Sequence, residues 1–138
     1  MKKSILLLLM LLIPVLALAQ TAEEYLDKGV AKHEKGDLRG AIQDYNKAIE
    51  LDPNDALAYG ARGIAKTAQE DSPGAIQDFS KAIELNPNDA LAYGLRGLSK
   101  IKLGQKDSGC LDLSKAGEMG SGIQKRWRES FGTQSDYT

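Results

Sequence analysis

Apolar residues between positions 38 and 51 recur at the spacing of an α-helix. They stand at i, i+1, i+4, i+7 and i+8, which places them on one face: Ala41, Ile42, Tyr45, Ala48 and Ile49. Polar residues occupy most of the remaining positions, so the pattern predicts an amphipathic helix over residues 38–51. Its apolar face must be covered by another element.

A shorter helix is predicted before it, beginning near Ala22. Tyr25 and Gly29 share one face of this helix, since residues four apart lie above one another. Gly36 and Asp37 follow. They separate the two helices because glycine adopts the left-handed conformation of a helix end and aspartate caps the next helix. The pattern therefore predicts two antiparallel helices joined by a short turn.

This helix pair returns at a fixed interval of 34 residues. Residues 22–55 and 56–89 are identical at 19 of 34 positions, and the segment ALAYG at 56–60 returns at 90–94. A period of this length with helical patterning indicates stacked pairs, because one pair cannot bury its apolar face alone. The three units are residues 22–55, 56–89 and 90–123, and the third is degenerate in its second helix.

Ile123, Trp127 and Phe131 recur every four residues at the end of the third unit. This spacing predicts a separate helix over residues 124–131 that caps the last unit, set off by the glycine-containing segment 120–122. Trp127 has the alternative role of stacking on a ligand. Residues 132–138 are polar and are expected to form a flexible tail.

The spacing of small and large residues, which recurs from unit to unit, resembles that of the tetratricopeptide repeat family. The matching residues of the first two units are Tyr25, Gly29, Ala41, Tyr45, Ala48 and Pro53, and then Tyr59, Gly63, Ala75, Phe79, Ala82 and Pro87. Small residues allow two helices to approach closely, and aromatic residues fill the remaining space. The resemblance implies an all-α, right-handed α-solenoid of three helix-turn-helix repeats, followed by the capping helix.

The turn of the second unit departs from this pattern. Glu70 stands where the other units have Gly36 and Gly104. A left-handed glutamate would cost about 1 kcal/mol or more. We therefore expect a turn of different shape, in which Ser72 caps the following helix and Pro73 is its first residue.

Residues 1–19 have the pattern of a secretory signal peptide. Two lysines precede an apolar run, and Ala17 and Ala19 supply the small residues of a cleavage site. We expect export to a bacterial periplasm or the cell exterior, with cleavage after Ala19 and only transient contact with the membrane. Retention as a membrane anchor is the alternative, although Pro14 interrupts a run shorter than the about 20 residues that a span needs.

The formal net charge of −1 disfavours a nucleic-acid partner, since binding a phosphate backbone needs an excess of basic residues. Hydrophobic residues make up 42% of the chain, which fits a folded domain rather than disorder. Cys110 is the only cysteine, so the chain has no internal disulfide. Its place beside Leu111 predicts a buried side chain.

The sequence offers no recognisable active site, so the protein is not expected to be an enzyme. His33 is the only histidine and has no partner at the spacing of a metal site. Neither a phosphate-binding glycine loop nor a nucleophile elbow is present. We therefore expect no catalytic residue, no metal and no cofactor.

One charged pattern recurs with the repeat. Lys28, Arg62 and Arg96 each stand sixteen residues before an aspartate, namely Asp44, Asp78 and Asp112. In an antiparallel hairpin this offset brings the two side chains together, and arginine offers a carboxylate a forked pair of donors. The pattern predicts a structural clasp within each repeat.

In tetratricopeptide repeats the first helices line a concave wall, and the resemblance implies which residues face it. The candidate partner contacts are Leu26, Val30, Ile64, Leu95, Leu98 and Ile101, with Lys102 as an orienting charge. An apolar groove of this kind suits a peptide or helix of a partner protein. The family's carboxylate clamp for acidic chaperone tails is not expected, because apolar residues occupy its positions: Leu26, Val30, Ala61, Leu91 and Leu95.

Two hypotheses about function follow. The first is a non-enzymatic protein–protein interaction scaffold that binds a peptide or helix of a partner in the concave groove. The second is a structural module that self-associates, or joins an envelope assembly, through its terminal faces. In that second case Trp127 and Phe131 would make the contact.

Overall fold

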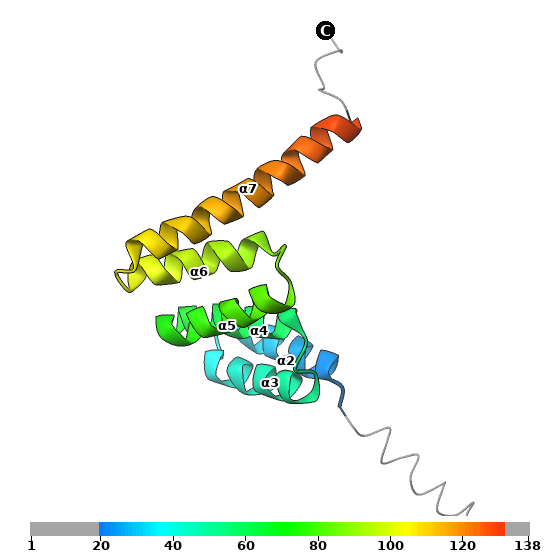
Figure 1. Ribbon diagram of the computed structural model, residues 1–138. Coiled ribbons are helices and arrows are strands. Elements are labelled where there is room, and N and C mark those ends of the chain that lie inside the picture. Colours follow the sequence, from blue (N-terminus) through cyan, green and yellow to red (C-terminus); the bar gives the residue numbers. More distant parts are fainter. Residues whose placement is uncertain (1–19, 132–138) are drawn as a thin grey trace, which may run out of the picture.

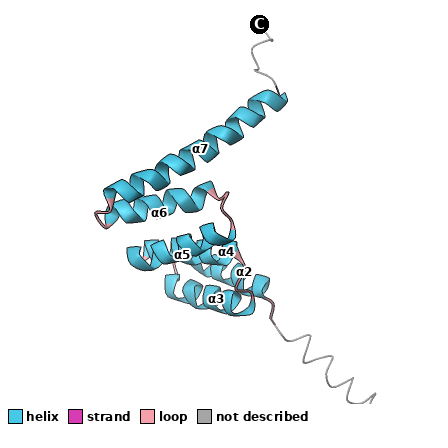
Figure 2. Ribbon diagram, viewed as in Figure 1, coloured by secondary structure: helices cyan, strands magenta, loops and turns pink. Residues whose placement is uncertain are grey.

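A computed structural model describes the backbone of residues 20–131 and the side chains of residues 20–122. The expected signal peptide, residues 1–19, and the expected tail, residues 132–138, lie outside the described residues. Every regular element of the described part is an α-helix (Figure 2). The helices are α2 (Ala22–Glu34), α3 (Leu38–Leu51), α4 (Ala56–Ala68), α5 (Ser72–Leu85), α6 (Ala90–Lys102) and α7 (Lys106–Phe131).

The helices form three consecutive pairs that stack in chain order, α2 with α3, α4 with α5 and α6 with α7 (Figure 1). The first helices of neighbouring pairs also touch, since α2 contacts α4 and α4 contacts α6. The second helices of neighbouring pairs do not touch within the described residues, since no contacts join α3 to α5 or α5 to α7. The stack is therefore closer along α2, α4 and α6, which form its inner wall.

Aspartates cap the four helices α3 to α6, and the cap at Asp37 is the one that the sequence predicts for α3. Asp37 Oδ1 accepts a hydrogen bond of 2.9 Å from the backbone N–H of Gly40, and Asp55 and Asp89 cap α4 and α6 in a similar way. Such a cap satisfies an amide that has no partner within the helix. The observed α3 coincides with the predicted helix over residues 38–51.

The turn before α5 has the same shape as the other two turns, so the expectation of a different shape is wrong. Glu70 adopts the left-handed conformation, with φ of 64°, beside values of 81° at Gly36 and Gly104. The turn thus keeps the common shape, and the backbone N–H of Asp71 bonds to the carbonyl of Lys66 as the repeat predicts. The cap is Asp71 rather than Ser72, because the Asp71 carboxylate accepts from Gly74 N at 2.9 Å. These bonds hold a residue whose conformation costs about 1–2 kcal/mol.

The two helices of a repeat meet at the glycines that the sequence singled out. A Cβ atom added to Gly63 would lie 2.8 Å from the Phe79 ring, and one added to Gly29 would overlap the Tyr45 ring. Tyr45 and Phe79 are almost fully buried. The aromatic ring of the second helix therefore occupies the space that the missing side chain leaves on the first.

The buried clusters cross from one repeat to the next. Ala41 and Tyr45 of α3 pack with Ala65 of α4. In the same way Ala82 and Ile83 of α5 pack with Ala92 of α6. Each apolar face is thus covered by the next pair, as the 34-residue period predicts.

The C-terminal end differs from the prediction of a separate capping helix. α7 runs without interruption from Lys106 to Phe131, and its last part projects beyond α6 (Figure 1). Ser121 stands where the earlier repeats have Pro53 and Pro87, so nothing removes the backbone donor that continues the helix. The side chains of Ile123, Trp127 and Phe131 lie outside the described residues.

Cys110 is exposed, which corrects its predicted burial. It occupies the repeat position of Ile42 and Ile76, which are half-buried. Ile42 packs on the cluster that includes Ala65 of the next repeat, whereas in the described residues α7 contacts α6 alone. Within residues 20–131 no helix is long and apolar enough to span a membrane.

Two glycine substitutions test this packing. Gly63→Ala should destabilise the chain by about 1–3 kcal/mol, because its methyl group would press on the Phe79 ring. Gly60→Ala is the matched control on the same helix, where an added Cβ meets nothing within 4 Å. That variant should gain about 0.5–1 kcal/mol from helix propensity. Urea unfolding measures both, and a stable Gly63→Ala variant would contradict the close approach.

Candidate functional site

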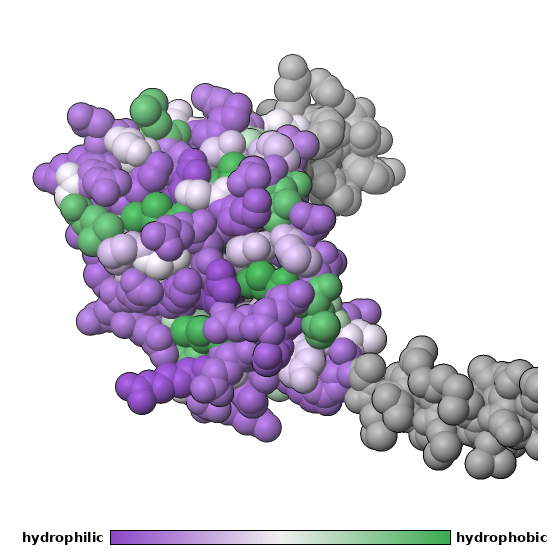
Figure 3. All heavy atoms as spheres, turned by 60° about the horizontal axis from the view of Figure 1, so that its bottom comes forward, coloured by the Kyte–Doolittle hydropathy of each residue, from purple (hydrophilic) through white to green (hydrophobic). Residues whose placement is uncertain are grey.

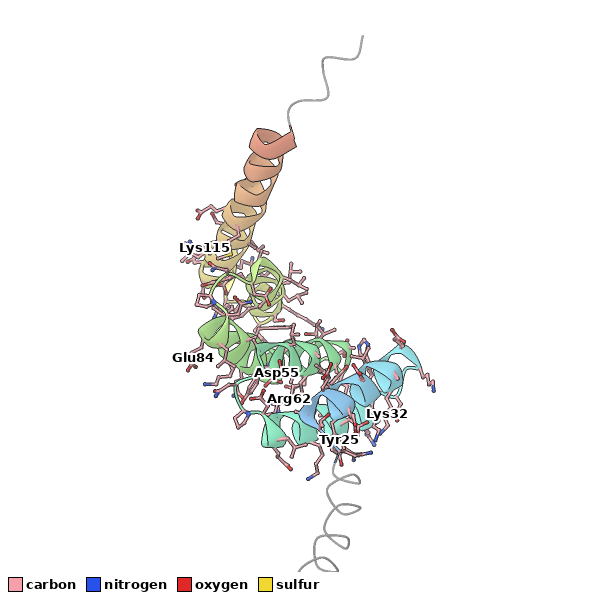
Figure 4. The ribbon with its side chains drawn as sticks, turned by 90° about the vertical axis from the view of Figure 1, so that its right-hand side faces the viewer. Tyr25, Lys32, Asp55, Arg62, Glu84 and Lys115 are labelled. Carbon is pink, nitrogen blue, oxygen red and sulfur yellow. The ribbon has the colours of Figure 1, made fainter. Side chains whose placement is uncertain are left out.

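An arginine on the first helix of the second repeat holds three helices together. Arg62 Nε and Nη2 donate to the two carboxylate oxygens of Asp78 on α5, at 2.9 and 2.6 Å. Its Nη1 donates to Asn46 Oδ1 on α3 at 2.7 Å. The predicted clasp is therefore confirmed for this pair, and it reaches one repeat further than predicted. Figure 4 shows Arg62 on α4, with Tyr25 and Lys32 on α2.

The third repeat contains the same arrangement. Arg96 donates to both oxygens of Asp112, at 2.8 and 2.7 Å, and through Nη1 to Ser80 Oγ of the preceding repeat at 3.2 Å. Ser80 stands 34 residues after Asn46, so each arginine finds an acceptor at the same place on the previous repeat. The clasp thus fixes the position of one pair on the next.

The first repeat does not form the predicted pair between Lys28 and Asp44. Lys32 Nζ approaches Asp44 Oδ2 instead, at 2.7 Å. Lys28 lies over the Tyr25 ring, 5.4 Å from its centroid. Lysine lacks the planar fork that would reach both oxygens of the carboxylate and a third acceptor.

A second series of lysines, which was not predicted from the sequence, forms ion pairs with the same aspartates. Lys66 Nζ lies 2.8 Å from Asp78 Oδ2, and Lys100 Nζ lies 2.8 Å from Asp112 Oδ2. Together with Lys32 they recur every 34 residues, and this spacing could have predicted the ion pairs from the sequence. Each of these aspartates is therefore held by cations of its own repeat.

The charges around Asp112 oppose the effect of its burial. Burial alone would raise the pKa of this carboxyl group, but the hydrogen bonds from Arg96 and Lys100 outweigh it and lower the pKa below its ordinary value. The group is thus ionised at neutral pH. The buried pairs are structural, and within residues 20–122 no cluster of ligating side chains could hold a metal ion.

The inner wall carries a row of exposed aliphatic side chains. Val30 on α2, Ile64 on α4 and Leu98 on α6 are 40%, 37% and 56% exposed. They occupy one repeat position on three helices that contact each other in order. We call these three residues the aliphatic row. Figure 3 shows one face of the molecule, on which small hydrophobic patches lie among hydrophilic residues.

The other predicted contacts are placed differently. Leu26 is half-buried and packs on the cluster around Ala41, Tyr45 and Ala65. Leu95 and Ile101 are also half-buried. Lys102 is exposed, with Nζ 3.8 Å from a carboxylate oxygen of Glu70.

Two further leucines extend the apolar surface, and the sequence reasoning did not count them among the partner contacts. Leu57 on α4 and Leu91 on α6 share one repeat position and are 71% and 63% exposed. Each lies seven residues before a member of the aliphatic row, which is two helical turns, and so on the same face. Gly60 lies between Leu57 and Ile64, and its surroundings are open.

Comparisons with known proteins give the same architecture. Residues 29–69 match the family model described as "TPR repeat". The crystal structure of MamA superposes with a TM-score of 0.74 at 28% identity, covering 76% of this chain and 61% of MamA. Residues 29–69 thus match the tetratricopeptide repeat (TPR) model, and the described chain has the fold of TPR structures. It spans about three-fifths of the MamA chain, and no curated protein sequence matches it.

Two further TPR structures contain bound segments of other proteins. The TPR2B domain of yeast Sti1, in complex with pHsp70, has a TM-score of 0.72 and 28% identity, covering 79% of this chain and 87% of that one. The second TPR of Spaghetti (RPAP3), bound to the HSP90 peptide SRMEEVD, has a TM-score of 0.71 and 25% identity. Its match covers 72% of this chain and 93% of that one. The TPR fold predicted from the sequence is thus confirmed, and similar TPR domains bind peptides.

A double-mutant cycle tests the clasp between Arg62 and Asp78. Arg62 and Asp78 are 18% and 4% exposed in their side chains. We expect a coupling energy of about 1–3 kcal/mol between Arg62→Leu and Asp78→Leu in thermal melts. The exposed pair Lys47 and Glu50 is the control, with an expected coupling below about 0.5 kcal/mol. Equal, near-zero coupling in both cycles would show that the clasp does not orient the hairpins.

Proposed function

We propose that this TPR chain is a non-enzymatic protein-interaction module that holds an apolar segment of a partner protein against its inner wall. The observation that carries the proposal is the aliphatic row, because one repeat position exposes a large apolar side chain on each of three adjacent helices. Burying such side chains stabilises a complex by about 25 cal/mol per Å². The row offers a partner a continuous line of contact.

The ligand class differs from that of the peptide-bound relatives. The peptide in the Spaghetti structure, SRMEEVD, is acidic at its end. At the positions that the family resemblance assigns to a carboxylate clamp, this chain has apolar residues: Leu26, Val30, Ala61, Leu91 and Leu95. They offer an acidic tail no cation. An apolar segment fits them better.

The alternative, self-association through the terminal faces, has less support. Ala58 and Ala92 are buried, Ala92 against Ala82 and Ile83 of the preceding repeat, and Glu24 stands at their position in the first repeat. A second copy stacked on that end would bury a carboxylate without a partner, which is costly. The side chains of Trp127 and Phe131 at the other end lie outside the described residues.

We further propose that the module acts after export, because residues 1–19 have the pattern of a signal peptide. The natural protein should then begin at Gln20. Mass spectrometry of the protein from its native cells that found an intact N-terminus would contradict export with cleavage.

Paired aspartate substitutions test the groove. Ile64→Asp with Leu98→Asp should abolish partner capture from envelope extracts, because charges in the aliphatic row prevent its burial. Leu111→Asp is the matched control, since Leu111 is 72% exposed on α7, outside the inner wall. The Leu111→Asp variant should still capture the partner. Circular dichroism should show equal helicity for the parent chain and both variants. Capture that survives in the paired variant would show that the groove is the wrong surface.

A further inference from the structure

The three inner helices present equivalent stripes of very different charge. On each helix, residues at i, i+4, i+7 and i+11 lie on one face. The stripe on α2 is Glu23, Asp27, Val30 and Glu34; on α4 it is Leu57, Ala61, Ile64 and Ala68; on α6 it is Leu91, Leu95, Leu98 and Lys102. The inner wall is therefore acidic over α2, apolar over α4, and apolar with one lysine over α6.

The carboxylates of the α2 stripe are available to a ligand. Glu23, Asp27 and Glu34 are all exposed. None of the ion pairs within residues 20–122 includes any of them. Two lysines of the same helix are engaged elsewhere, Lys32 with Asp44 and Lys28 with the Tyr25 ring.

Helix stability does not account for this arrangement. Glu23 lies in the first turn of α2, where the helix dipole favours a negative charge. Glu34 lies at the other end of the helix, where the dipole disfavours it, and Asp27 follows Glu23 at an unfavourable like-charge spacing. The two equivalent helices have no acidic residue at the positions of Asp27 and Glu34. These positions are Ala61 and Ala68 on α4, and Leu95 and Lys102 on α6.

We propose that the partner segment has a basic end that binds over α2 and a following apolar part that binds over α4 and α6. This inference rests on the proposed function and specifies its ligand. Asp27 and Glu34 flank Val30 on the same face of α2, so lysine or arginine residues at the end of the segment meet two carboxylates. Large apolar residues further along meet Ile64 and Leu98. Lys102 at the far edge, over α6, disfavours a basic residue there and so sets the direction of the segment.

Selection from a random dodecapeptide library displayed on phage tests the ligand chemistry directly. The mature chain should enrich peptides with lysine or arginine at one end and leucine, isoleucine or phenylalanine beyond it. A synthetic copy of an enriched peptide then serves as the probe in fluorescence anisotropy. The double variant Asp27→Asn, Glu34→Gln should bind it about 3- to 30-fold more weakly, as expected for two exposed ion pairs.

The matched control adds the same net charge on the outer helices. Gln43→Lys with Gln77→Lys changes two exposed residues of α3 and α5 and should leave the affinity within about twofold. In high salt the difference between the two double variants should shrink, because exposed charges are screened. Circular dichroism of each variant checks that the fold is intact.

The outcomes separate this inference from the proposed function. Enriched peptides that lack basic residues, or that bind the neutralised variant as tightly as the parent, overturn the basic-end inference. The groove itself stands in that case if Ile64→Asp with Leu98→Asp abolishes binding. No enrichment by the parent over this aspartate variant overturns both. A concentration-dependent dimer lost in the aspartate variant would show that a second copy occupies the wall, and would also overturn the inference.

Discussion

Burial of each helix pair by the next one is the constraint on which this structure depends. Both buried clusters join the second helix of one repeat to the first helix of the following repeat, through Tyr45 and Ala65 in one case and through Ile83 and Ala92 in the other. The arginine clasps cross the same boundaries, from Arg62 to Asn46 and from Arg96 to Ser80. Apolar burial supplies the driving force, and the directional hydrogen bonds fix the register of the stack.

As a result, apolar side chains on the inner wall are not needed for packing between repeats and stay exposed. The alanines and aromatic rings that bind the repeats to each other lie between the helices, whereas Val30, Ile64 and Leu98 contribute little to that core and remain exposed. The second helices hold the aspartates that anchor the clasps, so the first helices are kept in place without using their inner faces. The residues on those faces can therefore vary in charge from repeat to repeat while the fold is retained.

Positions that repeat in the sequence were predicted well, because the same packing problem is solved in each unit. The bounds of α3, the close approach at Gly63 and the bond from Arg62 to Asp78 all follow from the period. The equivalent pair of Lys28 and Asp44 does not form, because lysine lacks the fork of arginine. The wrong predictions concern Glu70 and Cys110. Their conformation and burial depend on neighbouring parts of the structure, which the rules for a single turn or helix do not include. Glu70 adopts a strained conformation because its turn is held by the flanking bonds, and Cys110 is exposed because, among the described elements, α7 is packed against α6 alone.

The candidate site was harder to predict, since helical spacing tells which side chains share a face but not how much each is covered. The family pattern places Leu26 in the groove, but Leu26 lies half-buried against Ala41 and Tyr45. Leu57 is not among the predicted contacts, yet its side chain is widely exposed. The reach of Arg62 to Asn46 depends on how two repeats are rotated against each other. That rotation is a property of the stack and cannot be obtained from one unit.

The most direct measurement of repeat interdependence is circular dichroism of residues 56–89 alone, compared with residues 20–138. A single repeat exposes both of its flanks and is too short for its helices to be stable in water. We expect the isolated repeat to be largely unfolded at 25 °C and residues 20–138 to melt in one cooperative transition. An isolated repeat with the helicity per residue of the whole chain, and a cooperative melt of its own, would contradict the account.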